Sequence, residues 1–168
     1  MYSVKEAQAM DYLLKRMQYN GLLKQITGEN SELKLVVQCN NKYLSGDFIK
    51  YQSGVVKQFE FNGPYEYENM TYNNQSIEVF NQLWKSFCDH YLPNNHSATF
   101  KRNEDLSVLL EVLFKHVKTV DISNSTIPLR PLIMNIEYLN NELGPSFLYL
   151  GEKEIDIVSI VQKETESL

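Results

Sequence analysis

The sequence contains few of the residues on which most enzyme and metal sites depend. Its 168 residues include three histidines, two cysteines and seven glycines. So few histidines restrict acid–base chemistry to a handful of positions, and two cysteines cannot form the disulfide framework of a small secreted domain. No Gly-x-Gly-x-x-Gly and no Gly-x-x-x-x-Gly-Lys-Ser/Thr sequence occurs, so nucleotide binding through either motif is not expected.

Long apolar runs are also missing. No segment approaches the roughly 20 apolar residues of a membrane-spanning helix, so we expect no membrane association. The first residues lack the charged and apolar regions of a secretory signal, and from this we expect a cytoplasmic protein. Asn-x-Ser/Thr sequences, which accept glycans in secreted proteins, favour the opposite location. They begin at Asn69, Asn74, Asn95 and Asn124.

The charge is acidic and unevenly distributed. The formal net charge is −5, and no basic stripe is present, so nucleic acid is not an expected partner. Residues 137–168 carry seven acidic residues and two lysines, which accounts for the whole net charge. Such a segment either attracts a basic protein partner or only solvates the outer face of the last strands.

The composition is that of a globular protein, with 43% hydrophobic and 22% charged residues. We expect one domain spanning 1–168, with a possible subdivision near 94–98. A helix over 4–19 is predicted by apolar spacing and by Ser3 with Glu6, which form a capping box. A second helix over 77–91 carries an aromatic stripe that includes Trp84, and a third over 106–117 follows Asn103.

The rest of the chain has the two-residue period of β-strands. Four strands are predicted over 33–39, 43–51, 55–61 and 65–72, with a hairpin turn at Asn40 and Asn41. Three more are predicted over 132–138, 146–150 and 154–161. Short connections favour an α+β fold in which an antiparallel sheet, a meander of about four strands plus a later three-strand segment, is covered by about three helices.

Two groups that contain histidine offer catalytic or metal-binding chemistry, and each lacks a feature that this chemistry requires. Cys88, His90 and His96 include metal-ligand types, but Cys88 and His90 lie about 200° apart around a helix. His116 has Glu111 and Asp121 nearby as acid–base partners, yet no nucleophile motif accompanies them. We therefore predict no catalytic residue, no metal ligand and no cofactor, and regard these as ordinary surface and helix-end histidines.

The best candidate for recognition is the predicted strand over 65–72, which combines acidic and aromatic side chains. Tyrosine is favoured at protein interfaces, and neighbouring carboxylates steer a basic partner. The alternative is an edge strand whose aromatics cover the core while its acids deter aggregation. The predicted partner-binding residues are Tyr65, Glu66, Tyr67, Glu68 and Tyr72.

These observations favour a small protein-binding module, such as an adaptor, inhibitor, chaperone or immunity-type protein, that masks a basic partner. One alternative is a hydrolase or metal-dependent enzyme that uses the histidines. Another is a sensor domain in which Trp84, Phe87 and Tyr91 line an apolar ligand pocket between sheet and helix. Pairing of sheet edges would also allow a homodimer.

Overall fold

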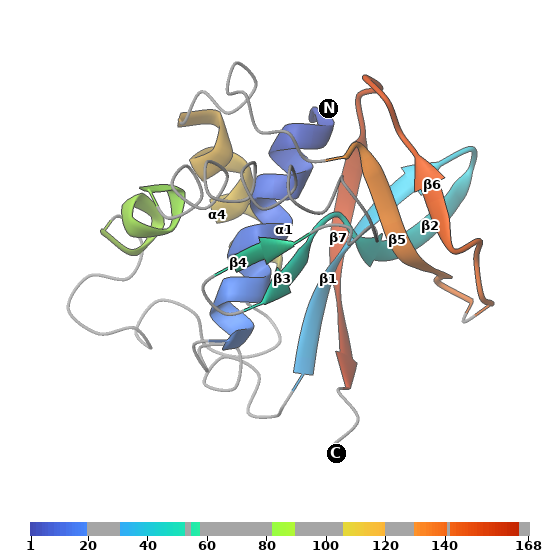
Figure 1. Cartoon of the computed structure of the whole chain (residues 1–168), viewed down its shortest axis with the longest axis horizontal. Helices are drawn as coiled ribbons and strands as arrows, with labels where there is room; N and C mark the ends of the chain where they lie inside the picture. The colour runs from blue at the N-terminus through green and yellow to red at the C-terminus, as the bar shows by residue number, and fades with distance from the viewer. Residues whose placement is uncertain are drawn as a thin grey trace, which may run out of the picture.

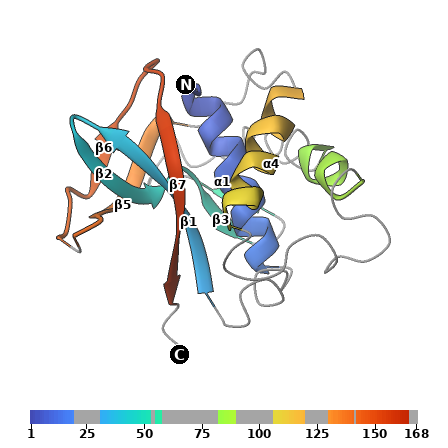
Figure 2. The ribbon, with the colours of Figure 1, turned by 180° about the vertical axis from the view of Figure 1, so that it is seen from behind.

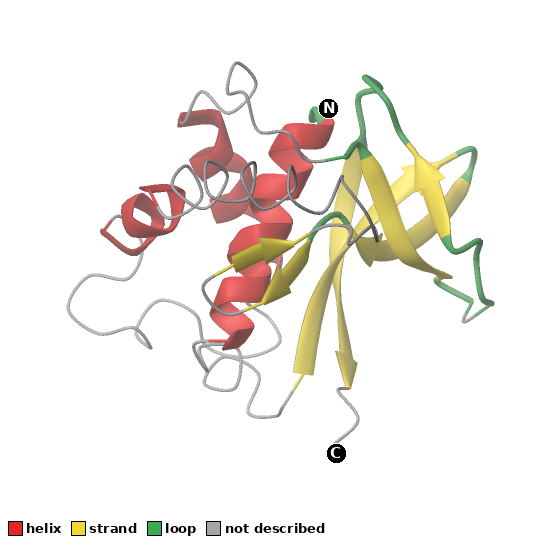
Figure 3. Cartoon of the chain, viewed as in Figure 1, coloured by secondary structure: helices red, strands yellow, loops and turns green. Residues whose placement is uncertain are grey.

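The computed structural model describes residues 1–19, 31–52, 55–57, 82–89, 106–119, 130–140 and 142–164. The described residues contain a five-stranded antiparallel sheet, a separate two-stranded sheet and three helical segments (Figures 1 and 3). This is an α+β fold, as predicted. The elements are α1 (Val4–Tyr19), β1 (Ser31–Cys39), β2 (Lys42–Asp47), β3 (Lys50–Gln52), β4 (Val55–Lys57), helical residues 82–89, α4 (Leu106–Thr119), β5 (Leu132–Tyr138), β6 (Phe147–Tyr149) and β7 (Asp156–Glu164).

The larger sheet has the strand order β6-β5-β2-β1-β7, with every neighbouring pair antiparallel. Strands β1 and β2 form the predicted hairpin, in which Cys39 pairs with Lys42 across the turn. Asn40 and Asn41 adopt φ values of 50° and 64°. Positive φ at both central residues is the requirement of the type I′ turn, whose twist matches that of the flanking strands.

The predicted strand over 43–51 is divided in the structure. β2 ends at Asp47, Phe48 and Ile49 leave the sheet for the hydrophobic core, and β3 begins at Lys50. β3 then pairs only with β4, in the separate two-stranded sheet. Gly46 and Asp47 interrupt the strand-forming residues of this segment, but the acceptor that holds the chain after β2 lies on α1 and is not visible in the local sequence. The predicted strand over 65–72 lies outside the described residues.

The larger sheet is strongly coiled. The register shifts between Val36 and Val37 where β1 meets β7, and between Ser45 and Asp47 where β2 meets β5. Such bulges increase local twist. Lys163 of β7 reaches Glu137 of β5 at 2.9 Å although two strands separate them, a span of about 14 Å in a flat sheet. The face that carries this pair is therefore concave.

Helix α1 is the most buried element of the described chain. Its capping box is present, since Ser3 N donates to Glu6 Oε1 at 3.0 Å and Glu6 N donates to Ser3 Oγ at 3.1 Å. It packs on β1, β3 and α4, while α4 also packs on β7. Figures 1 and 2 show both helices on one side of the larger sheet. The buried residues of α1 include Ala7, Ala9, Met10, Tyr12, Leu13, Leu14 and Met17.

The other helical segments complete this layer. Helix α4, which matches the helix predicted over 106–117, buries Leu109, Leu110, Leu113 and Val117. An ion pair of 3.0 Å between Lys118 Nζ and Glu6 Oε2 joins α4 to α1. Residues 82–89 are helical and bury Leu83 and Phe87, as the predicted apolar stripe requires. In the described residues no helix is both long and apolar enough to cross a membrane.

Candidate functional site

The most concentrated group of charges in the described chain is buried between α1 and the larger sheet. Asp11 has an exposed fraction of 0%, and its Oδ2 accepts the backbone N–H groups of Phe48 at 2.8 Å and Ile49 at 3.1 Å. Lys15, one helical turn later, donates to both Asp11 carboxylate oxygens at 2.8 Å. Asp11 therefore holds the chain where it leaves β2 and turns into the core.

Asp47 extends this group toward the sheet. Its Oδ1 accepts from Lys15 at 2.9 Å, and its Oδ2 accepts from Asn135 Nδ2 at 2.8 Å. Lys34 Nζ lies 3.4 Å from Asp47 and 3.1 Å from Glu32 Oε1. We call Asp11, Lys15, Lys34 and Asp47 the charge cluster, and Asn135, whose side chain is exposed, bonds to it from β5.

Neighbouring opposite charges shift the pKa values of two groups in the charge cluster toward their charged forms. Burial by itself raises the pKa of the Asp47 carboxyl, but the Lys15 and Lys34 ammonium groups outweigh it and lower that pKa. Burial by itself lowers the pKa of the Lys15 ammonium, whereas the Asp11 and Asp47 carboxylates outweigh it and raise that pKa. The charged forms of Asp47 and Lys15 are thus favoured, whereas at fully buried Asp11 burial outweighs the Lys15 ammonium and raises the pKa of the carboxyl. Because these side chains are bonded to one another and to backbone N–H groups, the cluster stabilises the fold.

His116 is a core residue. It is 2% exposed, its Nε2 lies 3.1 Å from the Leu83 carbonyl oxygen, and its ring meets the Phe87 ring edge-on at 5.5 Å. His116 therefore connects α4 to helical residues 82–89. His116 lies in the last turn of α4, the helix end predicted for it, and helical residues 82–89 cover this part of α4, which the sequence does not show. His90 and His96 lie outside the described residues.

Trp84 and Phe87 belong to the packed interior. Their rings stack with centroids 5.9 Å apart, and the Arg16 guanidinium lies 5.2 Å from the centre of the Trp84 ring. Phe87 is fully buried, and Trp84 packs against the core. These contacts favour the core role over the ligand-pocket role; Tyr91 lies outside the described residues. Among the described residues, no three His, Cys, Asp or Glu side chains form a group that could hold a metal ion.

Exposed apolar side chains gather instead on the β5–β6 hairpin, residues 132–150. Leu139 is 50% exposed, Leu143 88%, Phe147 53% and Tyr149 67%. We call these four residues the hairpin surface. Leu139 and Leu143 lie in the connection between the strands, and Phe147 and Tyr149 lie on β6, the last strand of the sheet.

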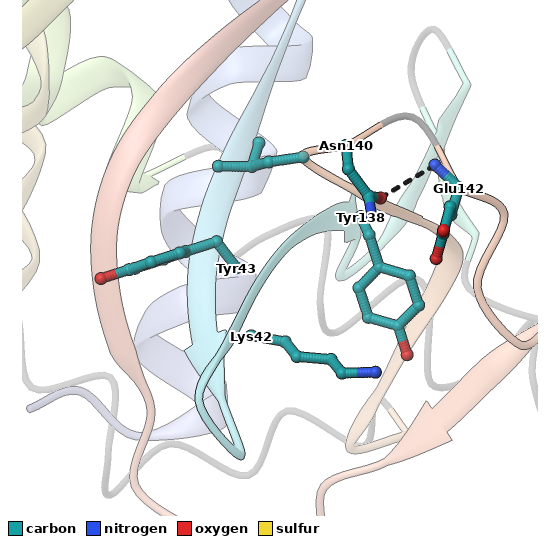
Figure 4. A pocket seen from close by; sticks show the side chains of 6 residues that line it. Lys42, Tyr43, Tyr138, Asn140 and Glu142 are labelled. Atoms are coloured by element: carbon teal, nitrogen blue, oxygen red, sulfur yellow. Dashed lines mark hydrogen bonds between the residues drawn. The ribbon is translucent and has the colours of Figure 1, made fainter.

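A shallow pocket of about 230 Å³ borders the hairpin surface (Figure 4). Lys42, Tyr43 and Tyr138 contribute to it from β2 and β5, together with Leu139 and Glu142 of the connection. The Lys42 side chain points toward the Tyr138 ring, with its Nζ 5.1 Å from the ring centre. A cation, a carboxylate and two phenols next to exposed leucines suit recognition of a mixed polar and apolar surface.

A second pocket of about 460 Å³ lies at the other end of β6. Its walls include Val4 and Gln8 of α1, Pro131 before β5, and Tyr149 and Glu152. Gln8 is 2% exposed and donates to the Arg130 carbonyl oxygen at 2.8 Å, which fixes the start of α1 against the start of β5. Tyr149 thus belongs both to this pocket and to the hairpin surface.

The predicted recognition residues Tyr65, Glu66, Tyr67, Glu68 and Tyr72 all lie outside the described residues, so their role stays a prediction. The sequence predicts a strand over 146–150 but does not single out the hairpin surface. The available signal was Phe147 and Tyr149 at period two beside acidic residues. The same pattern fits a strand whose aromatic side chains face a core. The position of β6 at the sheet edge distinguishes an exposed binding strand from such a core strand.

Comparison of the chain with protein-family models, with curated proteins and with solved structures gives no match in any of the three.

Proposed function

We propose that the chain is a protein-binding module that masks a partner carrying a basic surface. The observation that supports this most directly is the hairpin surface, where four large apolar side chains are half or more exposed in one short hairpin. Scattered single apolar residues are normal on a protein surface, whereas a group of them next to polar residues is typical of an interaction site.

The charge around the hairpin surface supports a basic partner. Residues 139–156 carry Glu142, Glu152, Glu154 and Asp156 against the single Lys153, a formal net charge of −3. All five side chains are exposed. Opposite charges across an interface raise the rate of association and exclude wrong partners. The acidic residues therefore favour a basic partner, while the apolar residues supply the binding energy.

The chemistry of the other described residues supports binding rather than catalysis. The charge cluster holds the segment after β2 against α1, and His116 Nε2 contacts the Leu83 carbonyl oxygen. Cys39 and Cys88 are free thiols in the structure. Free thiols are typical of reducing compartments, so we propose a cytoplasmic location as well.

Affinity capture followed by a purified binding measurement tests this function. Tagged wild-type protein and a variant with Leu143→Ser and Phe147→Ser are incubated with native extract, and retained proteins are identified by mass spectrometry. We expect one stoichiometric protein with a basic surface that the variant loses. Calorimetry with that purified protein should show a loss of at least about tenfold in affinity, because central apolar residues carry most of the binding energy.

The matched control is Val158→Ser on β7, since Val158 is 42% exposed but lies on the opposite edge strand. This variant should bind as wild type does. A second variant, Glu66→Lys with Glu68→Lys, measures whether the acidic residues of the 65–72 segment contribute. Equal capture by wild type and by the Leu143→Ser, Phe147→Ser variant contradicts the proposed function.

A further inference from the structure

Among the described strands, β6 is an edge strand, and one side of its backbone is open there. In the five-stranded sheet it pairs only with β5, through Leu132 with Tyr149, Ile133 with Leu148 and Met134 with Phe147. Leu150 N donates to the Pro131 carbonyl oxygen at 2.7 Å, and Asn135 N donates to the Ser146 carbonyl oxygen at 3.3 Å. The backbone groups of residues 146 and 150 therefore face β5.

The antiparallel ladder fixes the direction of the intervening residues. Hydrogen-bonded positions alternate along an antiparallel strand, so Leu148 also faces β5, whereas the N–H and C=O groups of Phe147 and Tyr149 point away from it. The Phe147 and Tyr149 side chains remain 53% and 67% exposed in the whole chain. Two aligned donors and two aligned acceptors thus lie at an open edge beside two exposed aromatic rings.

The opposite edge strand, β7, has features that protect it from pairing with another chain. At the start of β7, Tyr2 N donates to the Ile155 carbonyl oxygen at 2.9 Å, and Ile155 N donates to the Tyr2 carbonyl oxygen at 2.7 Å. β7 also carries an irregularity at Val158, opposite Val36 and Val37 of β1, and contacts α4. Covered or bulged edges resist pairing with another chain, and β6 has neither protection in the described structure.

We propose that β6 accepts an extended, lysine- or arginine-bearing segment of the partner protein as a sixth strand of the sheet. This proposal rests on the proposed function and names its binding mode. The open backbone groups supply main-chain hydrogen bonds, and the exposed aromatics contact alternate side chains of the added strand. The net charge of −3 over residues 139–156 favours a basic segment and disfavours a second copy of this acidic chain.

The 460 Å³ pocket at the end of β6 extends the same site. Tyr149 forms one of its walls, and the Glu152 carboxylate lies at its border. A strand laid along Phe147 and Tyr149 continues past this pocket, whose volume of about 460 Å³ suits one side chain of the added segment. Alternate side chains of an added strand commonly enter such pockets and provide specificity.

The test uses the full chain and a defined probe, the acetylated and amidated peptide Lys-Val-Lys-Val-Lys-Val-Lys. Amide hydrogen exchange is measured by NMR with and without the peptide. Exchange at the Phe147 and Tyr149 amides should slow by about tenfold or more, because strand addition places both N–H groups in hydrogen bonds. The control peptide, with glutamate in place of every lysine, should leave both exchange rates unchanged.

Two substitutions at one position separate backbone pairing from side-chain contact. Tyr149→Pro removes an N–H that makes no bond to β5, and proline is tolerated at such edge positions. Tyr149→Thr removes the ring but keeps the N–H. We expect Tyr149→Pro to bind the lysine peptide at least about fivefold more weakly than Tyr149→Thr, the loss of one hydrogen bond. Circular dichroism checks that both variants fold, and the exchange measurement on wild type stands independently of them.

Several results overturn the proposal. It fails if the lysine peptide does not bind, if it binds without slowing the two amides, or if Tyr149→Pro and Tyr149→Thr bind equally. It also fails if sedimentation shows a dimer whose Phe147 and Tyr149 amides are already protected, because a second copy then occupies the edge. In each case, a captured partner that still depends on Leu143 and Phe147 leaves the proposed function standing, whereas loss of that dependence removes both.

Discussion

Asp11 is the residue on which the local architecture depends most. Its buried carboxylate accepts two backbone N–H groups from the segment that leaves β2 and also pairs with Lys15. A carboxylate inside a protein is stable only when its charge and lone pairs are matched, and all of the partners of Asp11 come from parts of the chain that α1 brings together. The turn after β2 is therefore determined by a residue about 37 positions earlier.

Replacing Asp11 with alanine should destabilise the protein strongly. The Asp11→Ala variant leaves the Phe48 and Ile49 N–H groups without their acceptor and leaves Lys15 with Asp47 as its remaining partner in the cluster. We expect the free energy of unfolding to fall by about 3–5 kcal/mol, as when one partner of a buried ion pair is removed. Urea denaturation followed by circular dichroism measures this.

The matched control for Asp11 is Asp89→Ala, because Asp89 also lies on a helix but is exposed. This change should alter the free energy of unfolding by no more than about 0.5 kcal/mol. If Asp11→Ala costs less than about 1 kcal/mol, the hydrogen bonds and ion pair of Asp11 are not what holds the chain after β2.

Lys15 should make the protein sensitive to high pH. Its pKa is raised in the folded state, because the Asp11 and Asp47 carboxylates outweigh the opposing effect of burial. A raised lysine pKa contributes stability that is fully present below the unfolded value, about 10.4, and is lost as pH rises through the folded value. We therefore expect the free energy of unfolding to decline above about pH 10.4.

NMR of the Lys15 side-chain Cε resonance measures the same effect directly. The resonance should keep its ammonium position at pH values where a lysine in an unfolded peptide has already lost its proton, near 10.4. In an Asp47→Asn variant the Lys15 pKa should lie lower than in wild type, since one of its two carboxylate partners is then neutral. Titration of Lys15 at or below the unfolded value in wild type contradicts the role assigned to the two carboxylates.

Among the elements, the β1–β2 hairpin follows local rules. Asn40 and Asn41 both adopt positive φ, a conformation that costs most residues about 1–2 kcal/mol and that asparagine tolerates better than most. The sequence therefore predicts this turn without knowledge of the rest of the fold. The break between β2 and β3 is the opposite case, because its cause lies on α1.

Substitutions at Asn41 should affect stability in opposite directions. Asn41→Gly should raise the free energy of unfolding by a few tenths to about 1 kcal/mol, since an Asn-Gly pair is preferred in a type I′ turn. Asn41→Val should lower it by about 1–2 kcal/mol, because a β-branched residue is strained at φ of 64°. Thermal unfolding of both variants beside wild type is the measurement, and an equal effect of the two changes contradicts this turn geometry.

At the scale of the whole molecule, residues from the two ends of the chain meet. Tyr2 pairs through its backbone with Ile155, and its ring stacks on Phe114 of α4 with centroids 4.6 Å apart. Helix α1 contacts β1, β3 and α4, so one hydrophobic core includes residues from both sides of the predicted subdivision near 94–98. These contacts favour one cooperative folding unit.

Denaturant unfolding should accordingly be a single transition. Trp84 is the sole tryptophan of the chain, and it packs against the shared core. Its fluorescence should therefore change at the same denaturant concentration as the far-ultraviolet circular dichroism of the whole protein, the usual test of two-state unfolding. Two separated midpoints would contradict a single domain and support a boundary near 94–98.

The sequence by itself determined the features that depend on neighbouring residues. Helical spacing and the Ser3–Glu6 capping box predicted α1, the period of two predicted β5 and β6, and the Asn40–Asn41 pair predicted the hairpin turn. The α+β class followed from the order and the short connections of these elements. Each of these signals extends over a few residues, because helices and turns are stabilised by local hydrogen bonds and backbone preferences.

Tertiary structure decided what depends on distant residues. It ended β2 at Asp47 through a carboxylate on α1, it buried His116 under a second helix, and it placed β6 at an open sheet edge. The open backbone edge beside Phe147 and Tyr149, and with it the proposed binding site, depends on strand order. Strand order is fixed by long-range pairing and by burial of the shared core, and the side-chain period of a single strand is the same at an edge as at the centre.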